Sequence, residues 1–167
     1  EDRRTLVEVS LAPAEDGRWS FEVKSRPSDG DEMISNASGM VARRGEAPPR
    51  AADLRRFREA CPTPVDLDAL YNGFAEQGLE YGPRFRCIRE LQIGPDEAFS
   101  TLTTEDDLGS YLAHPTLTDG AIQTALAAAG SGVESTHLPV GIDRLDMFGR
   151  LDQTVYCHAR ITDQDVR

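Results

Sequence analysis

The stretch His114-Pro115-Thr116-Leu117-Thr118-Asp119-Gly120-Ala121-Ile122-Gln123 decides how the chain is interpreted. Proline is favoured in the first turn of a helix, because its fixed φ suits the helix and its missing N–H would be unsatisfied there. We therefore expect a helix over residues 115–129. Asp119 is the only charged residue in that segment, and the rest is mostly apolar. This pattern predicts a helix buried on most of its circumference, with Asp119 facing the interior.

Gln123 lies four residues after Asp119, which places both side chains on one helix face. Its amide can donate a hydrogen bond to the carboxyl group and orient it. Burial favours the neutral form of a carboxyl group, whereas a helix N-terminus favours the charged form. If burial dominates, Asp119 can serve as a general acid. The alternative is a structural role in which Asp119 caps the helix N-terminus.

Length and composition describe an ordinary globular chain. With 167 residues, 39% hydrophobic and 28% charged, it is long enough for one domain with a core or for two small layered units. No apolar run is long enough to cross a bilayer, and no signal peptide is visible. The three cysteines, Cys61, Cys87 and Cys157, are widely spaced and form no zinc or redox motif. We therefore expect a cytoplasmic protein without a metal site.

The net charge of −11 disfavours nucleic acid and anionic membranes as partners, because binding to phosphate groups relies on clustered Lys and Arg. One basic cluster interrupts the acidic background, and it consists of Arg43, Arg44, Arg50, Arg55, Arg56 and Arg58. It could contact an acidic partner protein. The alternative, which needs no partner, is a solvated linker or helix face.

The order of elements indicates an α+β fold. A hairpin is expected from alternating residues 5–11 and 19–23 around a turn, followed by a strand over 33–42. Residues 45–64 are rich in Pro, Ala and Arg and indicate a linker with a short helix at 54–60. A helix should begin after the N-cap Asp66 and end at Gly78. Four strands are expected at residues 85–93, 98–103, 138–148 and 154–162. An antiparallel sheet around one long buried helix is the architecture that these patterns predict.

Three motifs, taken together with their order along the chain, resemble those of the dehydratase domains of modular polyketide synthases. The stretch HPTLTDGAIQ is similar to their His-Pro-x-x-x-Asp-x-x-x-Gln/His signature. The segment Tyr81-Gly82-Pro83-Arg84-Phe85 resembles their Tyr-Gly-Pro-x-Phe motif, and Leu138-Pro139 resembles their Leu-Pro strand. The resemblance implies a double-hotdog fold, incomplete here at both ends. Residues 1–44 would close the first hotdog, 45–64 would be the linker, and 65–167 would form the second hotdog with the acid motif.

The resemblance also implies an activity, the elimination of water from a β-hydroxyacyl thioester carried on the phosphopantetheine arm of an acyl carrier protein. Asp119 would be the catalytic acid and Gln123 would hold it in place. The substrate-binding residues would be Tyr81, Gly82, Pro83, Phe85, His114, Pro115 and Pro139. The enzyme would need no metal or redox cofactor. Its partners would be the carrier protein and neighbouring synthase domains, and homodimerisation stays open.

One expected motif is absent. The family's base is a histidine in a His-x-x-x-Gly-x-x-x-x-Pro motif, and none of His114, His137 and His158 lies in such a motif. His114 is expected to shape the helix start, and structural roles are expected for the other two. We therefore expect a dehydratase that lacks part of its sequence, including the base. The alternatives are a non-catalytic scaffold or dimer module and a dehydratase-like isomerase or pyran-forming cyclase.

Overall fold

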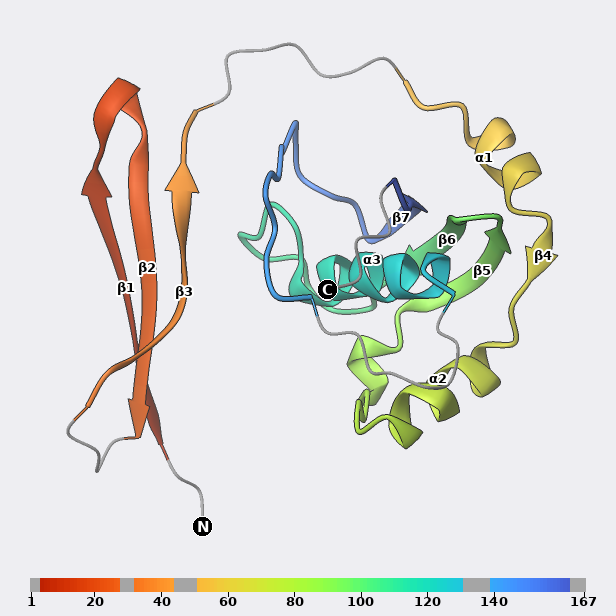
Figure 1. Cartoon of the computed structure of the whole chain (residues 1–167), viewed down its shortest axis with the longest axis horizontal. Helices are drawn as coiled ribbons and strands as arrows, with labels where there is room; N and C mark the ends of the chain where they lie inside the picture. The colour runs from red at the N-terminus through yellow and green to blue at the C-terminus, as the bar shows by residue number, and fades with distance from the viewer. Residues whose placement is uncertain (1–3, 28–31, 44–50, 131–138, 163–167) are drawn as a thin grey trace. The chain divides into compact units, whose positions relative to one another are not determined.

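The computed structural model describes residues 4–27, 32–43, 51–130 and 139–162. The chain divides into two compact units, Glu1–Ala47 and Pro48–Arg167. Figure 1 shows the first unit in red and orange and the second in yellow to blue. In the described part of the chain, no helix is long and apolar enough to span a membrane.

The first unit is a three-stranded antiparallel sheet in the order β1-β2-β3. Its strands are β1 (Thr5–Pro13), β2 (Trp19–Pro27) and β3 (Ile34–Val41), and the short 3-10 turn η1 (Glu15–Gly17) joins the first two. The expected hairpin and third strand are therefore confirmed. Gly39 on β3 is paired with Phe21 on β2, and a Cβ atom on Gly39 would lie 2.6 Å from the Phe21 ring. The absence of a side chain at Gly39 makes room for that ring.

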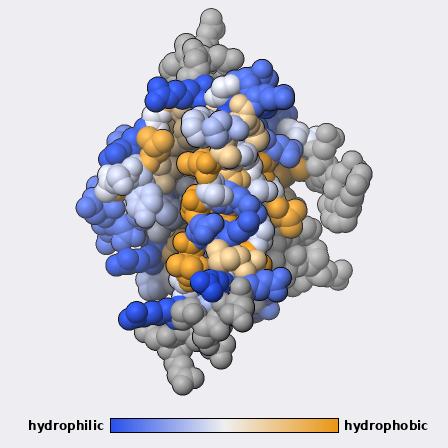
Figure 2. All heavy atoms as spheres, turned by 90° about the vertical axis from the view of Figure 1, so that its left-hand side faces the viewer, coloured by the Kyte–Doolittle hydropathy of each residue, from blue (hydrophilic) through white to orange (hydrophobic). Residues whose placement is uncertain are grey.

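One face of this sheet is apolar. The register pairs Val9 with Val23 and Leu11 with Phe21, so these side chains share a face. The opposite face carries charged residues such as Glu8, which is paired with Lys24. Figure 2 views the molecule from the side on which β1 lies in Figure 1 and shows orange apolar side chains exposed between blue hydrophilic ones.

The second unit holds a four-stranded antiparallel sheet in the order β4-β5-β6-β7. The strands are β4 (Thr63–Pro64), β5 (Ile88–Gly94), β6 (Glu97–Thr103) and β7 (Thr154–Arg160). The helices are α1 (Leu54–Ala60), α2 (Leu67–Glu76) and α3 (Pro115–Ala128), with a 3-10 turn η2 (Pro83–Phe85) before β5. The predicted short helix at 54–60 and the predicted helix after Asp66 are both present.

The long helix α3 packs against β5, β6 and β7. Leu117 on α3 and Leu102 on β6 are both 1% exposed, and they belong to one buried cluster with Ile88 and Leu91. Burying a side chain of this size stabilises the fold by about 1.5–3 kcal/mol. On the other face of the sheet, Phe57 of α1 contacts the ring of Phe99. The antiparallel sheet with a buried helix is therefore confirmed.

The predicted strand at residues 138–148 is wrong over the part that is described, because residues 139–148 contain no helix or strand. Val140, Ile142 and Leu145 in this segment are exposed. The physical reason is that this segment has no strand to pair with: the sheet ends at β7, which pairs with β6 alone among the described residues. Alternation of apolar residues shows which side chains could share a face, but it does not provide the pairing partner that a strand needs.

The other boundaries move by a few residues. The strand expected from residue 85 begins at Ile88, because Pro83–Phe85 forms a turn of 3-10 helix instead. In the expected linker 45–64, Thr63–Pro64 pairs with β5 and belongs to the second sheet. Within the basic cluster, Arg55 pairs with Glu59 and Arg58 with Glu90. Arg44 and Arg50 lie outside the described residues.

Candidate functional site

The site is built on the first two turns of α3. His114 is the N-cap residue, and its ring Nδ1 accepts the backbone N–H of Thr116 at 3.4 Å. The Thr116 hydroxyl in turn donates to the Thr104 hydroxyl at 3.2 Å, which ties the helix start to the chain just after β6. His114 therefore shapes the turn, as expected. Asp119 lies beyond the first turn, so the alternative reading of Asp119 as a helix cap is wrong.

Gln123 holds the Asp119 carboxyl group. Its Nε2 donates to Oδ2 of Asp119 at 2.6 Å and to the backbone carbonyl of Phe85 at 2.9 Å. Its Oε1 accepts a hydrogen bond from the Tyr71 hydroxyl at 3.1 Å. The Gln123 side chain is fully buried, whereas Asp119 is half-buried. A buried amide with both donors and its acceptor satisfied is fixed in one orientation, so it presents an N–H group to the carboxyl oxygen.

Aromatic side chains surround this pair. The rings of Tyr71, Phe74 and Tyr81 make edge contacts, with centroids 6.2 Å apart for Tyr71 and Phe74 and 5.3 Å for Phe74 and Tyr81. Burial, and after it the charge of Asp119, raise the pKa of the Tyr81 hydroxyl. The structure therefore brings Tyr81 to the acid, although the two residues lie far apart in the sequence.

The remaining predicted substrate-binding residues are distributed around this centre. Gly82, Pro83 and Phe85 are exposed in and beside η2, and the Phe85 carbonyl contacts Gln123. Pro115 is exposed at the first position of α3. Pro139 is exposed in a segment without helix or strand, so its role in a substrate tunnel stays a prediction.

Sequence reasoning missed Tyr71 as a residue that contacts the candidate site, because Tyr71 fits the apolar stripe of α2. Only 6% of its surface is exposed, and burial raises the pKa of Tyr71 to about 12. Its hydroxyl therefore stays protonated at neutral pH and can donate. A buried tyrosine hydroxyl usually has a hydrogen-bond partner, and this was the available signal. The Phe85 carbonyl carried no signal in the sequence.

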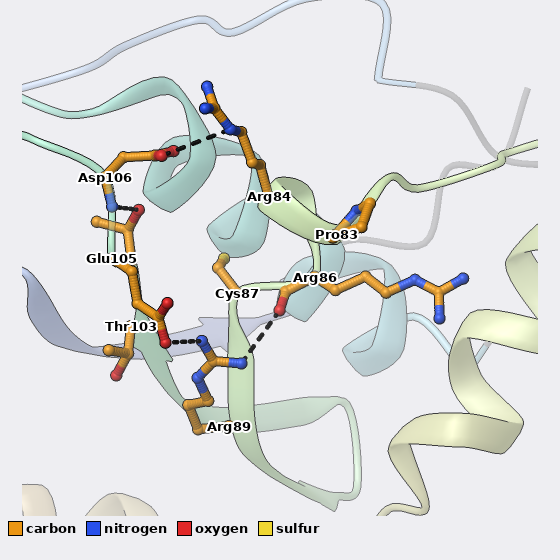
Figure 3. A pocket seen from close by; sticks show the side chains of 9 residues that line it. Pro83, Arg84, Arg86, Cys87, Arg89, Thr103, Glu105 and Asp106 are labelled. Carbon is orange, nitrogen blue, oxygen red and sulfur yellow. Dashed lines mark hydrogen bonds and ion pairs between the residues drawn. The ribbon is translucent and has the colours of Figure 1, made fainter.

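A pocket of about 260 Å³ lies beside this site (Figure 3). It is lined by residues of η2, of β5 and of the chain around the end of β6. Arg84 pairs with Asp106 at 3.6 Å, and Arg89 pairs with Glu105 at 4.0 Å. Two of the arginine side chains that line the pocket are therefore compensated by carboxylates that also line it. Cys87 also lines it, and burial raises the pKa of this thiol, which makes it a poor nucleophile.

In the part of the chain that is described, no histidine forms a hydrogen bond or ion pair with Asp119. His158 Nε2 lies 2.8 Å from Glu97, and its ring stacks on Phe57 at 4.0 Å, which is a structural arrangement. His137 lies outside the described residues. The described residues also contain no group of three His, Cys, Asp or Glu that could hold a metal ion.

Comparison with known proteins identifies the family to which this chain belongs. A family model described as "Polyketide synthase dehydratase N-terminal domain" matches residues 49–167. The pikromycin polyketide synthase component PikAII of Streptomyces venezuelae is 33% identical over 146 residues, 81% of this chain. The spectinabilin polyketide synthase system protein NorB of Streptomyces orinoci is 36% identical over 120 residues, 69% of this chain. The chain spans 4% and 5% of the length of these relatives.

Solved structures agree on the fold. The dehydratase domain from the CurK module of curacin polyketide synthase superposes with a TM-score of 0.87 at 24% identity. The match covers 99% of this chain and 61% of the CurK domain. The corresponding domain of the CurF module gives a TM-score of 0.81 at 23% identity, over 96% of this chain and 59% of that one. With an α+β hotdog architecture, the motif from His114 to Gln123 on α3 and these matches, the chain belongs to the dehydratase domains of polyketide synthases.

Proposed function

We propose that this chain carries the acid half of a hydro-lyase site that acts on a β-hydroxyacyl thioester. The observation that carries the proposal is the 2.6 Å hydrogen bond from the buried Gln123 amide to Oδ2 of Asp119. This bond leaves Oδ1 to hold the acidic proton. When Asp119 gives up that proton, the remaining carboxylate accepts a charge-assisted hydrogen bond that is stronger than the one to the neutral acid. Gln123 therefore favours the proton transfer as well as orienting the acid.

The reaction needs a base as well. The base removes the α-proton, the electron pair forms the α,β double bond, and the β-hydroxyl leaves as water after taking the Asp119 proton. We assign the base to a histidine outside these 167 residues, since the family's histidine motif is absent from them. The solved relatives include His-to-Phe and Asp-to-Asn variants of the CurK dehydratase, and both are described as inactive.

The substrate, partners and architecture follow from the same proposal. The acyl group would be carried on the phosphopantetheine of an acyl carrier protein, with no other cofactor. Neighbouring synthase domains would belong to the same polypeptide as this chain, and the synthase would work in the cytoplasm. Residues 1–44 would close a first hotdog and 65–167 would form the second. Tyr81, Gly82, Pro83, Phe85 and the helix-start residues His114 and Pro115 would border the substrate together with Pro139.

Two other functions remain as alternatives. A non-catalytic scaffold or dimer module is favoured by the missing histidine motif. Against it stands the Asp119 carboxyl group, which is held by a fully buried amide that a scaffold would not require. An isomerase or pyran-forming cyclase could use the same acid with a differently shaped tunnel.

The proposal is tested with a β-hydroxyacyl group loaded on the carrier protein, by following the loss of water by mass spectrometry. The variant Asp119→Asn is made in the synthase polypeptide that carries this chain. We expect its dehydration rate to fall by about 10²–10⁴-fold, because a general acid contributes that much. The matched control Asp68→Asn changes an exposed aspartate on α2 and should keep the full rate.

Each other result has a defined meaning. Water loss that is unaffected in Asp119→Asn would show that Asp119 is not the acid. No water loss from the unaltered, folded protein would favour the scaffold. With an α,β-unsaturated acyl substrate, a shifted double bond or a pyran ring formed at unchanged mass would favour the isomerase or cyclase.

A further inference from the structure

The Tyr71 hydroxyl connects α2 to Asp119 through the side chain of Gln123. It lies 3.1 Å from Oε1 of Gln123, and Nε2 of the same amide lies 2.6 Å from Oδ2 of Asp119. Tyr71 and Gln123 are both buried, so water does not compete for these bonds. Tyr71 itself does not hydrogen-bond Asp119, and any effect on the acid must pass through the amide.

The direction of each hydrogen bond in this chain of contacts is determined by its neighbours. Oε1 of Gln123 is an amide oxygen and can only accept, so the Tyr71 hydroxyl is the donor in the hydrogen bond between them. The nitrogen of the amide must then face the Phe85 carbonyl and Asp119, and both of these groups accept.

The opposite orientation of the amide would be harmful to an acid. With the amide turned over, Oε1 would face two acceptor oxygens, the Phe85 carbonyl and Oδ2 of Asp119. The carboxylate formed after proton transfer would then meet a lone pair instead of an N–H group. The Phe85 carbonyl and Asp119 disfavour the turned-over amide on one side, and the Tyr71 hydroxyl holds Oε1 on the other side, where a phenylalanine would offer no donor.

Tyr71 is itself held rigidly. The guanidinium group of Arg86 lies over its ring, 5.1 Å from the centroid, and Arg86 Nε also donates to the Tyr81 carbonyl at 3.0 Å. The Phe74 and Tyr81 rings contact Tyr71 edge-on. These contacts place the hydroxyl independently of the bond that it makes to Gln123, as a positioning group requires.

We propose that Tyr71 is a positioning residue of the dehydratase site, which holds the Gln123 amide in the orientation that presents an N–H group to the Asp119 carboxyl group. The inference rests on the proposed function, since it concerns the acid assigned there. It extends the site from α3 to α2, so that two helices far apart in the sequence set the geometry of one carboxyl group.

The test compares Tyr71→Phe, which removes only the hydroxyl, with the unaltered protein. In the 167-residue chain labelled with ¹⁵N, the side-chain amide of Gln123 should give one sharp pair of resonances. In Tyr71→Phe we expect this pair to shift and broaden, because Oε1 loses its donor and the amide is held from one side only. In the synthase polypeptide, kcat for dehydration should fall about 10-fold with KM unchanged, because the loss of one hydrogen bond is worth about that factor.

The matched control is Tyr156→Phe, which removes the same hydroxyl from an exposed tyrosine on β7 and should change neither measurement. Unchanged Gln123 resonances in folded Tyr71→Phe would overturn the inference. So would altered resonances with an unchanged kcat, or a rise in KM that accounts for the whole effect. If the unaltered synthase removes no water, the proposed function fails, and that result is distinct from a failure of Tyr71→Phe alone.

Discussion

Gly120 shows at the scale of one residue why the acid motif needs glycine after Asp119. A Cβ atom there would overlap Cys87 Sγ and lie 3.2 Å from Leu102 Cδ2. We expect Gly120→Ala to lower the free energy of unfolding by about 1–3 kcal/mol through overpacking, as measured by urea denaturation. The control Gly73→Ala lies in α2 with no atom within 4 Å of the new Cβ, and it should raise stability by about 0.4–1 kcal/mol. Equal effects of both variants would contradict close packing at Gly120.

At the scale of the element, α2 depends on its first turn. The Asp66 carboxylate accepts the backbone N–H groups of Asp68 and Ala69 at 2.9 and 3.2 Å. We expect Asp66→Ala to lower the free energy of unfolding by about 1 kcal/mol, as measured by thermal or urea denaturation, because two N–H groups lose their acceptor. Asp66→Asn keeps an acceptor oxygen and should retain most of that stability. If both variants lost the same amount, the charge of Asp66 rather than its cap would be responsible.

At the scale of the whole molecule, the three-stranded sheet carries an uncovered apolar face. Val7, Val9 and Leu11 are 58%, 62% and 61% exposed, on the face opposite Glu8. Exposed apolar surface of this kind binds hydrophobic dyes and promotes association. We expect Val9→Lys to reduce the fluorescence of bound anilinonaphthalene sulfonate, whereas Glu8→Lys on the other face should not. A similar reduction by both variants would assign the dye signal to net charge.

Local patterns predicted the elements well where the physics is local. The hairpin of the first unit, the start of α3 at Pro115, and the cap and end of α2 at Asp66 and Gly78 depend on residues within one or two turns of each other. Gly78, for example, has a φ of +84° just after α2, a conformation that glycine adopts readily. The pair Asp119 and Gln123 was predictable for the same reason, because four residues make one helical turn.

The features that the sequence did not predict depend on contacts between residues that lie far apart in the chain. The alternation in residues 138–148 could not show that residues 139–148 would pair with no strand, although β7 lies at the edge of the sheet. Nor could the stripe of α2 show that the Tyr71 hydroxyl would meet an amide 52 residues later. The sequence by itself determined the helix, the Asp119 carboxyl group on it and the amide one turn away. Only the tertiary structure decided which groups orient that amide, because contacts between distant segments arise from packing and leave no periodic pattern in the chain.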